Sequence, residues 1–433
     1  MSKVFGLVRF LPLQFGLGYL LATLLLFFFG PFDWPLKNED VLLLFLTAVL
    51  LALCLGFSIG VIKRAPGARL QSWRVFFRIG ALFSIALLFP STWAYTGKWP
   101  WEVMSVLGDQ GQAYRDMLVA LEANESGIRN YVAMVRGLAA PFVCCVIPFA
   151  ILNWRSMRAI DVLLLAGHIS AILIFSLMRG TDRETGDLVV FFMTAFLILG
   201  CQAIVRHGRL PFSFGKMAVS AVLLLSILFG AFVLFVERKE SRMGGSEDFC
   251  IAEGIVCSHR SASASELDAK TSFALEMLTG YTAQGYYGLS LALQEDFTST
   301  LGLGHSAFLI STFTKAVDES LYERSYLHKV DLAGWNDKAQ WSTLFTWIAS
   351  DISFPLVPLA IAVLGFLWGS AWKSAVLWNS EAGALVFLFL TLSVLYMPAN
   401  NQLTQTLDSY FAFLFWLTVW LSQGRGTHAT ANA

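Results

Sequence analysis

Ten separated runs of apolar residues constrain this fold more than any other feature of the sequence. They cover roughly 10–30, 41–62, 75–95, 138–153, 160–178, 188–205, 217–236, 352–372, 383–397 and 407–422. Most are close to the 20 or so residues that a helix needs to cross about 30 Å of hydrocarbon. Because 56% of the residues are hydrophobic and only 14% are charged, the composition excludes an ordinary soluble globular protein. We therefore expect an all-α, polytopic membrane protein with about 10 (roughly 10–12) transmembrane helices.

The apolar runs divide the chain into three parts. Residues 1–236 are expected to form about seven N-terminal transmembrane helices, and residues 347–433 about three C-terminal ones followed by a tail. Between them lies the one long polar interruption, residues 237–346, where we expect a large extracytoplasmic loop containing short helices. The first run lacks the small-residue cleavage site of a signal peptide and is followed at once by a second run, so it is expected to remain as an anchor.

Lysines and arginines gather in the short loops on one side of the predicted helices. They are Lys3, Arg9, Lys63, Arg64, Arg69, Arg74, Arg155, Arg158, Arg206, Arg209, Lys216, Lys373 and Arg425. Because cytoplasmic loops contain an excess of lysine and arginine, we expect both termini in the cytoplasm of a multi-pass protein of the bacterial inner membrane. The long segments are then periplasmic. The formal net charge is zero, so nothing in the charge balance indicates a nucleic-acid partner.

Two cysteines lie in the large outer segment. Cys250 and Cys257 are close in sequence, and an oxidising compartment favours a local disulfide between them; the alternative is two free thiols. The remaining cysteines fall within apolar runs, where a thiol behaves as a small hydrophobic group. No cluster of cysteine, histidine and carboxylate residues has the spacing of a metal site, so we expect no metal and no cofactor.

Arginines at the outer ends of the predicted helices are candidates for binding a phosphate. Arg179 and Arg183 lie in a short outer loop, 179–187, and Arg136 immediately precedes the fourth run. A guanidinium is planar, permanently charged and bidentate toward phosphate oxygens, and each charged hydrogen bond contributes about 1.5–3 kcal/mol. The alternative is that these arginines only pair with the carboxylates of the same loop.

Aromatic and polar residues of the outer segment are candidates for binding sugar. Tyr281, Gln284 and Tyr286 lie in a glycine-rich run, 280–288, which follows a predicted helix starting near residue 265, and Trp341 precedes the eighth apolar run. Aromatic faces suit the apolar faces of pyranose rings. The alternative is that these aromatic residues anchor the protein at the membrane interface.

One histidine of the outer segment is a candidate catalytic base. His305 lies in the run Gly302-Leu303-Gly304-His305-Ser306, where the glycines let the backbone approach a ligand closely and the imidazole accepts a proton near neutral pH. The alternative is a structural histidine. Asp351, at the expected start of the eighth helix, is either its N-terminal cap or a second candidate base that faces an aqueous cavity.

Taken in order along the chain, the outer segments resemble the oligosaccharide repeat-unit polymerases (O-antigen polymerases) of bacterial inner membranes. The resemblance runs from about Asp109 onward. The pieces that show it are Tyr114, Arg129 and Arg136, the 179–187 loop, Gly285-Tyr286-Tyr287-Gly288-Leu289, Gly302-Leu303-Gly304-His305-Ser306, and Trp341-Ser342-Thr343 with Asp351.

The resemblance implies a glycosyltransferase that moves a growing glycan from one undecaprenyl diphosphate to a single lipid-linked repeat unit outside the membrane. Arg136 and Arg179, with Arg183 in reserve, would stabilise the charge that develops on the departing diphosphate. His305, or else Asp351, would take the proton of the attacking hydroxyl. The partners it implies are undecaprenyl-diphosphate-linked oligosaccharide, the bilayer, a chain-length regulator and a flippase.

Two other functions remain open at this point. An O-antigen ligase would use the same donor but transfer the glycan to lipid A core; the His–Asn pair of ligases is not visible here, because His328 is followed by Lys329. A flippase or transporter of lipid-linked oligosaccharide is the alternative from a different class. Transporters usually place charges within their spans and show repeated halves, and neither feature is evident in this sequence.

Overall fold

The structure is a computed structural model that describes residues 5–63, 65–123, 127–208, 266–337 and 339–423, with short pieces at 230, 232–233, 235–237, 239–240, 250–251 and 256–257. Within these ranges the chain is built from helices, apart from the antiparallel strands β1 (Cys250–Ile251) and β2 (Val256–Cys257). The expected all-α fold is therefore found in the described residues.

The long helices follow the apolar runs closely. They are α2 (Leu11–Phe29), preceded by the single turn α1 (Phe5–Val8), α3 (Glu39–Ile62), α4 (Trp73–Thr96), α7 (Ile128–Val143) continued by α8 (Val146–Leu152), α9 (Ala159–Arg179), α10 (Arg183–His207), α17 (Val357–Trp378), α18 (Glu381–Tyr396) and α19 (Leu407–Ser422). The outer segments form α5 (Val103–Val106), α6 (Gln110–Ala123), α12 (Glu266–Ala292), α13 (Ala307–Ala316), α14 (Ser320–Glu323), α15 (Tyr326–Leu332) and α16 (Leu344–Ile352).

Seven helical stretches in the described part of the chain are long and apolar enough to cross a membrane. They are Phe5–Phe29, Glu39–Ile62, Trp73–Thr96, Ile128–Leu152, Ala159–Arg179, Arg183–His207 and Phe354–Trp378, and α18 and α19 are shorter apolar helices. This is the pattern of a multi-pass membrane protein. The run expected at 217–236 lies mostly outside the described residues.

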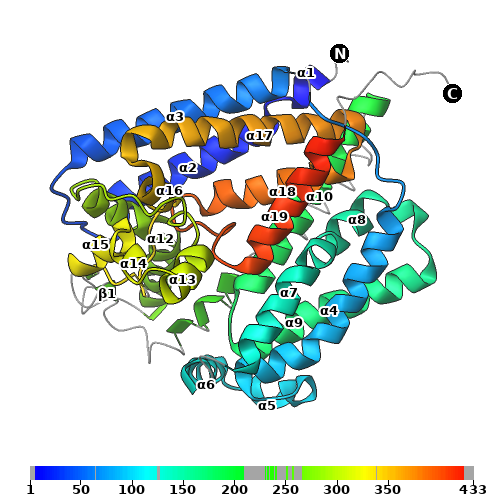
Figure 1. Cartoon of the computed structure of the whole chain (residues 1–433), viewed down its shortest axis with the longest axis horizontal. Helices are drawn as coiled ribbons and strands as arrows, with labels where there is room; N and C mark the ends of the chain where they lie inside the picture. The colour runs from blue at the N-terminus through cyan, green and yellow to red at the C-terminus, as the bar shows by residue number, and fades with distance from the viewer. Residues whose placement is uncertain are drawn as a thin grey trace.

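Glycines bring α3 and α17 into unusually close contact. A Cβ atom on Gly56 or Gly60 would lie 2.0 or 2.1 Å from a carbonyl oxygen of α17, and one on Gly365 or Gly369 would lie 2.6 or 2.4 Å from a carbonyl oxygen of α3. Both helices thus present a glycine pair four residues apart, the small-residue spacing that lets membrane helices pack backbone to backbone. The two helices lie side by side in Figure 1.

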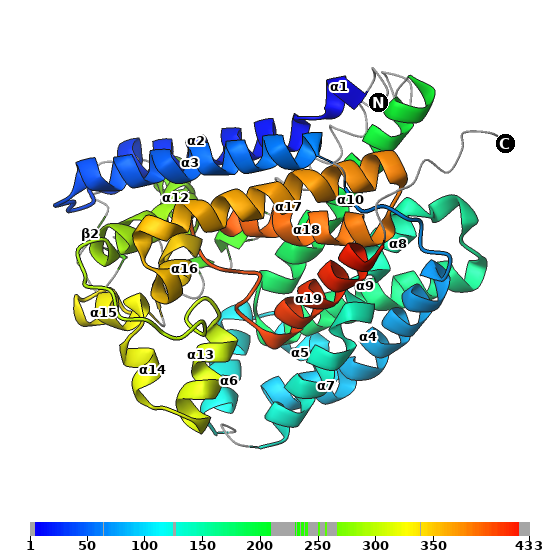
Figure 2. The ribbon, with the colours of Figure 1, turned by 45° about the horizontal axis from the view of Figure 1, so that its top comes forward.

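A second group of helices, α4, α7 and α9 with α19 against α7, is joined to the α3–α17 pair through α18 and α10 (Figure 2). A Cβ on Gly80 of α4 would lie 1.9 Å from the carbonyl oxygen of Phe142 in α7. The indole of Trp416 in α19 donates a hydrogen bond at 2.8 Å to the carbonyl oxygen of Pro141, in the last turn of α7. Small residues and a buried indole therefore hold this group together.

The two ends of the helix bundle differ in what covers them. At one end, the indole of Trp372 donates to Val8 O at 3.2 Å, the ammonium of Lys373 to Ile62 O at 3.1 Å, and the hydroxyl of Ser380 to Gln423 Oε1 at 2.8 Å. The other end carries the cluster α12 to α16 (Figures 1 and 2). The first long helix, α2, thus begins on the side of the bundle where the last helix, α19, ends.

The glycine-rich run 280–288 forms part of a long helix and does not follow one, which corrects the sequence-based expectation. Helix α12 extends from Glu266 through Ala292. Its glycines serve close packing: a Cβ on Gly285 would lie 2.2 Å from Pro398 O, and one on Gly288 would lie 2.8 Å from the indole nitrogen of Trp335. Neighbouring elements occupy the space that side chains would need, so tertiary packing overrides the turn tendency of glycine.

Candidate functional site

The two residues predicted to be catalytic, His305 and Asp351, are in direct contact. Oδ2 of Asp351 accepts hydrogen bonds from the backbone N–H of His305 at 2.9 Å and lies 2.9 Å from its Nδ1. Oδ1 accepts from the backbone N–H of Gly304 at 2.8 Å and from the hydroxyl of Thr300. Asp351 lies in the last turn of α16 and not at the start of a helix, so the alternative of an N-terminal cap is wrong.

These hydrogen bonds decide the charge of Asp351. Burial works to raise the pKa of its carboxyl, but the hydrogen bonds from His305, Thr300 and the two backbone amides outweigh burial and lower the pKa below its ordinary value. Asp351 is therefore ionised near neutral pH. An ionised carboxylate accepts a hydrogen bond from Nδ1–H of His305. In a neutral imidazole the other ring nitrogen, Nε2, then has no proton and is an acceptor.

Tyr410 completes the arrangement at the other ring nitrogen. Its hydroxyl lies 3.0 Å from Nε2 of His305, so Asp351, His305 and Tyr410 form a continuous hydrogen-bonded chain. The side chain of His305 is 29% exposed and that of Asp351 9%, which places the carboxylate inside and the imidazole within reach of a ligand. An imidazole oriented by a buried carboxylate is the arrangement of a general base.

The loop that holds His305 is fixed from two sides. The carbonyl oxygen of His305 accepts hydrogen bonds from the side-chain amide of Asn401 at 2.5 Å and from the hydroxyl of Thr404 at 2.6 Å. Gly304 packs so closely that a Cβ would lie 2.2 Å from the hydroxyl of Thr300 in the same loop and 2.7 Å from the Cβ of Ser350 in α16. Leu301 takes a φ of 60°, a conformation that a side chain disfavours, so packing overrides local preference along this loop.

The predicted arginines converge at a second place, around two aromatic rings. The guanidinium carbon of Arg136 lies 4.5 Å from the ring centre of Phe175, and that of Arg179 lies 5.0 Å from the same ring. The ring of Tyr95 is within 5.2–5.8 Å of Arg129, Arg136 and Arg179. Helices α4, α7 and α9 thus bring three cations together, and stacking on rings leaves the N–H edges of a guanidinium open to an anion.

Carboxylates form ion pairs with three of these outer arginines, Arg136, Arg179 and Arg183, which together with Arg129 are called the arginine cluster below. Arg179 pairs with Glu184, Arg183 Nε lies 3.9 Å from Asp187 Oδ2, and Arg136 places Nε and Nη2 both 3.2 Å from Asp408 Oδ2. The ion pairs expected of an exposed loop therefore exist, and one of them reaches a distant helix. Arg136 directs two of its five N–H groups at one oxygen atom, so pairing does not exhaust its capacity for an anion.

A cavity of about 240 Å³ opens beside the arginine cluster. Polar residues of the cluster line it: Arg136, Glu184, Asp187, Asp408 and Ser409. Its other walls are largely apolar, from Leu87, Leu88, Ala140, Val143, Ile147, Ala171, Ile172, Phe175, Leu188, Phe191, Phe389, Leu392 and Ala412. It reaches His168, eleven residues before Arg179 on α9, or about 16 Å along the helix. The cavity therefore combines a charged end with an apolar shaft.

The first turn of α19 separates the arginine cluster from His305. Asp408 and Tyr410 are two residues apart, so their side chains leave the helix about 200° apart. The guanidinium of Arg183, the first residue of α10, lies 3.5 Å from the hydroxyl of Thr406, the N-cap of α19. Two helix N-termini thus add partial positive charge next to the arginines.

A smaller cavity, of about 190 Å³, gathers three of the four residues predicted to contact sugar: Tyr281, Gln284 and Trp341. The fourth, Tyr286, is buried against α2, with its hydroxyl 3.0 Å from that of Thr23. No face of this ring is available to a sugar, which corrects the prediction for Tyr286.

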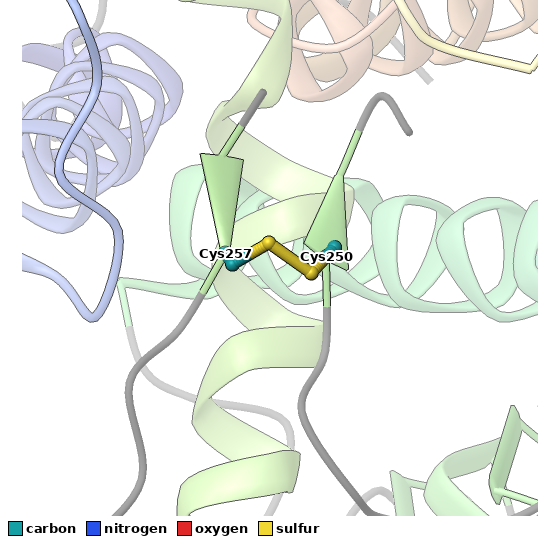
Figure 3. The surroundings of a disulfide bond; sticks show 2 residues. All are labelled: Cys250 and Cys257. Carbon is teal, nitrogen blue, oxygen red and sulfur yellow. A yellow bond between two sulfur atoms is a disulfide. The ribbon is translucent and has the colours of Figure 1, made fainter. Parts of the chain in front are cut away.

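The disulfide lies at the edge of the smaller cavity. Cys250 and Cys257 are joined across the pair β1–β2 (Figure 3), and Cys250 and Ile251 line the cavity together with α12 residues. The covalent link fixes this short hairpin next to Tyr281.

Several residues of the site have no individual signal in the sequence. Asn401 and Asp408 belong to a polar stretch, 400–408, between two apolar runs, and Tyr410 follows two residues later. That stretch is the signal that would have pointed to them. Among the described residues, no three histidine, cysteine or carboxylate side chains come together as a metal site.

Comparisons of the chain with protein-family models, with curated proteins and with solved structures found no match.

Proposed function

We propose that this chain is a membrane glycosyltransferase that polymerises undecaprenyl-diphosphate-linked oligosaccharide repeat units at the periplasmic face of the bacterial inner membrane. The observation that carries the proposal is the larger cavity, which has Arg136 with Glu184, Asp187 and Asp408 at one end and an apolar shaft within the helices. Arg179 lies beside this end, on the same Phe175 ring as Arg136. A diphosphate attached to a polyprenyl chain has the same two parts in the same order.

The donor is proposed to bind with its diphosphate at Arg136 and Arg179 and its first isoprene units in the shaft. Arg183 lies on the same side, 3.5 Å from the hydroxyl of Thr406. Each charged hydrogen bond to a phosphate oxygen contributes about 1.5–3 kcal/mol, and the N-termini of α10 and α19 favour the same anion. The paired carboxylates keep the guanidinium groups oriented before the diphosphate arrives.

The reaction joins the two halves of the site. A hydroxyl of the acceptor sugar attacks the anomeric carbon of the donor glycan, a new C–O bond forms, and the C–O bond to the diphosphate breaks. The arginines stabilise the negative charge on the leaving diphosphate. The proton of the attacking hydroxyl passes to Nε2 of His305, directly or through the hydroxyl of Tyr410, while Asp351 stabilises the resulting imidazolium.

The first turn of α19 sets the distance between the diphosphate at the arginines and the proton acceptor, His305. A helix with its side chains is about 10–12 Å across, so the diphosphate and the proton acceptor lie on the two sides of one helix end. The anomeric carbon, with the diphosphate oxygen on one side and the attacking hydroxyl on the other, is proposed to lie between the arginines and His305 at this helix end.

The membrane arrangement is part of the proposal. About ten spans, both termini in the cytoplasm and residues 237–346 in the periplasm follow from the lysine and arginine bias of the short loops. The disulfide between Cys250 and Cys257 suits an oxidising compartment. It lies in the part of the chain assigned to the periplasm.

The surface glycan of a strain that lacks this chain tests the proposal. A polymerase predicts that only single repeat units are attached to the surface lipid, and complementation restores the ladder of longer chains. Complete absence of attached glycan indicates instead the ligase, which shares the donor. Lipid-linked units that accumulate on the cytoplasmic side indicate a flippase. An unchanged ladder rejects all three.

A further inference from the structure

The smaller cavity is lined by a buried amide, that of Gln284, whose oxygen atom has no hydrogen-bond partner in the described part of the chain. Gln284 is only 8% exposed. Buried polar atoms are almost always paired, because leaving one unpaired destabilises the fold. Gln284 belongs to the lining of the cavity, but Oε1 itself is covered, so a partner from outside the chain reaches this atom once the amide turns toward the cavity.

The other walls of the cavity define the chemistry of that partner. Tyr281 and Trp341 meet edge to face, with ring centres 4.9 Å apart and planes at 90°, so they form two apolar walls at right angles. Gln340 adds a second amide, and Gly280 leaves space where a side chain would stand. The ammonium of Lys239 lies 4.6 Å from the ring centre of Tyr281, where the ring attracts it.

This combination suits a sugar better than a lipid or a phosphate. A carboxamide offers an acceptor and two donors, which matches the hydroxyl groups that surround a pyranose ring. Aromatic rings cover its apolar C–H face. A lipid tail would leave the amide of Gln284 unpaired, and a phosphate would place its oxygens against the Oε1 acceptor.

The smaller cavity lies near the candidate catalytic loop. Gly285, next to Gln284, packs on Pro398, and Asn401 holds the carbonyl oxygen of His305. The three residues from Pro398 to Asn401 span at most about 10 Å. A glycan with one sugar at Gln284 can therefore extend to His305.

We propose that the cavity formed by Tyr281, Gln284 and Trp341 is a carbohydrate-binding subsite that holds one sugar of the glycan away from the bond being formed. The proposal rests on the proposed function. A chain held there between transfers stays at the enzyme and is extended again. The subsite therefore increases the number of repeat units that are added before the chain is released.

Two variants with matched controls test the subsite. Gln284→Leu removes the amide while keeping a side chain of similar size, and Trp341→Ala removes one wall. Gln294→Leu and Trp99→Ala change the same residue types at exposed outer positions. We expect the first two variants to lower the modal number of repeat units at least about twofold and the controls to leave it unchanged; equal lengths in all four would overturn the proposal.

Binding separates failure of the subsite from failure of the proposed function. The purified protein in detergent is titrated with the host's own polysaccharide, released from its lipid by mild acid, and tryptophan fluorescence is followed. We expect binding by the wild type and by His305→Ala, and about tenfold weaker binding by Gln284→Leu, the effect of losing one or two hydrogen bonds. Absence of wild-type binding, or equal binding by Gln284→Leu, overturns the subsite. Wild-type binding with chain lengths unaffected by His305→Ala would instead contradict the proposed function and leave the subsite standing.

The thermal unfolding midpoint of Gln284→Leu shows whether this variant is folded. Because leucine removes a buried unpaired polar atom, Gln284→Leu is expected to unfold at the same temperature as the wild type or higher. A lower midpoint would show that the amide has a structural role and would contradict the proposal.

Discussion

Asp408 and Tyr410 lie two residues apart in the first turn of α19 and serve opposite halves of the candidate site. Asp408 pairs with Arg136 at 3.2 Å, and the hydroxyl of Tyr410 lies 3.0 Å from His305 Nε2. One turn of helix thus ties the arginine cluster to the candidate base. A small movement of this turn would change both halves at once, which makes α19 the element that sets their relative position.

Replacing Arg179 by alanine is expected to weaken donor binding. Loss of one charged hydrogen bond to the diphosphate corresponds to about 10- to 100-fold, so long chains should collapse toward single repeat units on a glycan gel. Arg324→Ala is the matched control, because Arg324 also forms an outer ion pair, with Asp318 at 2.9 Å, but outside the cluster. A normal ladder from Arg179→Ala would remove this arginine from the site.

The chain Asp351–His305–Tyr410 predicts a graded loss of activity. His305→Ala should lower the rate about 10²- to 10⁴-fold, the range for a general base, with the protein still present in the membrane. His328→Ala is the control histidine, located on α15. Equal activity of His305→Ala and His328→Ala would reduce His305 to a structural residue.

Tyr410→Phe distinguishes two roles of the tyrosine hydroxyl. If the hydroxyl relays the proton, the variant should lose activity nearly as strongly as His305→Ala. If an incoming acceptor displaces the hydroxyl from Nε2, the variant should keep most of its activity. The rate of chain growth measured in membranes, with the amount of protein held equal, decides between the two roles.

Acid is expected to remove the stability that Asp351 provides. Its pKa is lowered in the folded protein from an ordinary value of 3.8, so its contribution is fully present above that value and is lost as the pH falls through the lower, folded value. The difference in unfolding midpoint between the wild type and Asp351→Asn should therefore shrink as the pH falls from about 5 to about 3. A constant difference over that range would show that ionisation of Asp351 does not stabilise the loop.

The close contact of α3 and α17 predicts a strong dependence on glycine. Gly365→Leu places a side chain where α3 leaves 2.6 Å to a carbonyl oxygen, and such overpacking costs about 1–3 kcal/mol or more. Gly18→Leu is the control, since a Cβ there has no neighbour within 4 Å. The unfolding midpoint should fall for Gly365→Leu alone, and equal midpoints would contradict the packing described.

Hydropathy predicted most of the described long helices to within a few residues, because a membrane-spanning helix needs little beyond apolar length. The start of α7 is the exception, since this helix begins at Ile128, ten residues before the expected run 138–153. Helix α3 was expected at 41–62 and lies at Glu39–Ile62. Helix α12 was not predicted over 280–288, because glycines and tyrosines in such a run are typical of a loop. Its glycines are needed for close packing against Pro398 and Trp335, which are distant in sequence. Local composition does not contain that information.

The candidate site was predictable in its residue types but not in its pairings. Arginines and a glycine-framed histidine stand out from an apolar sequence, and the structure joins His305 to Asp351. Tyr410 lies 105 positions from His305, and Asp408 lies 272 positions from Arg136. Such contacts follow from how the helices pack, which a single sequence does not specify.

Polymerisation by the purified protein tests the central claim most directly. The protein in lipid nanodiscs is supplied with the host's undecaprenyl-diphosphate-linked repeat unit, and glycan length and released undecaprenyl diphosphate are measured together. The account predicts one undecaprenyl diphosphate for each new linkage with the wild type, and neither product with Arg179→Ala or His305→Ala at the same substrate concentration. Absence of linkage with an intact wild-type protein, or linkage that neither substitution reduces, would contradict it.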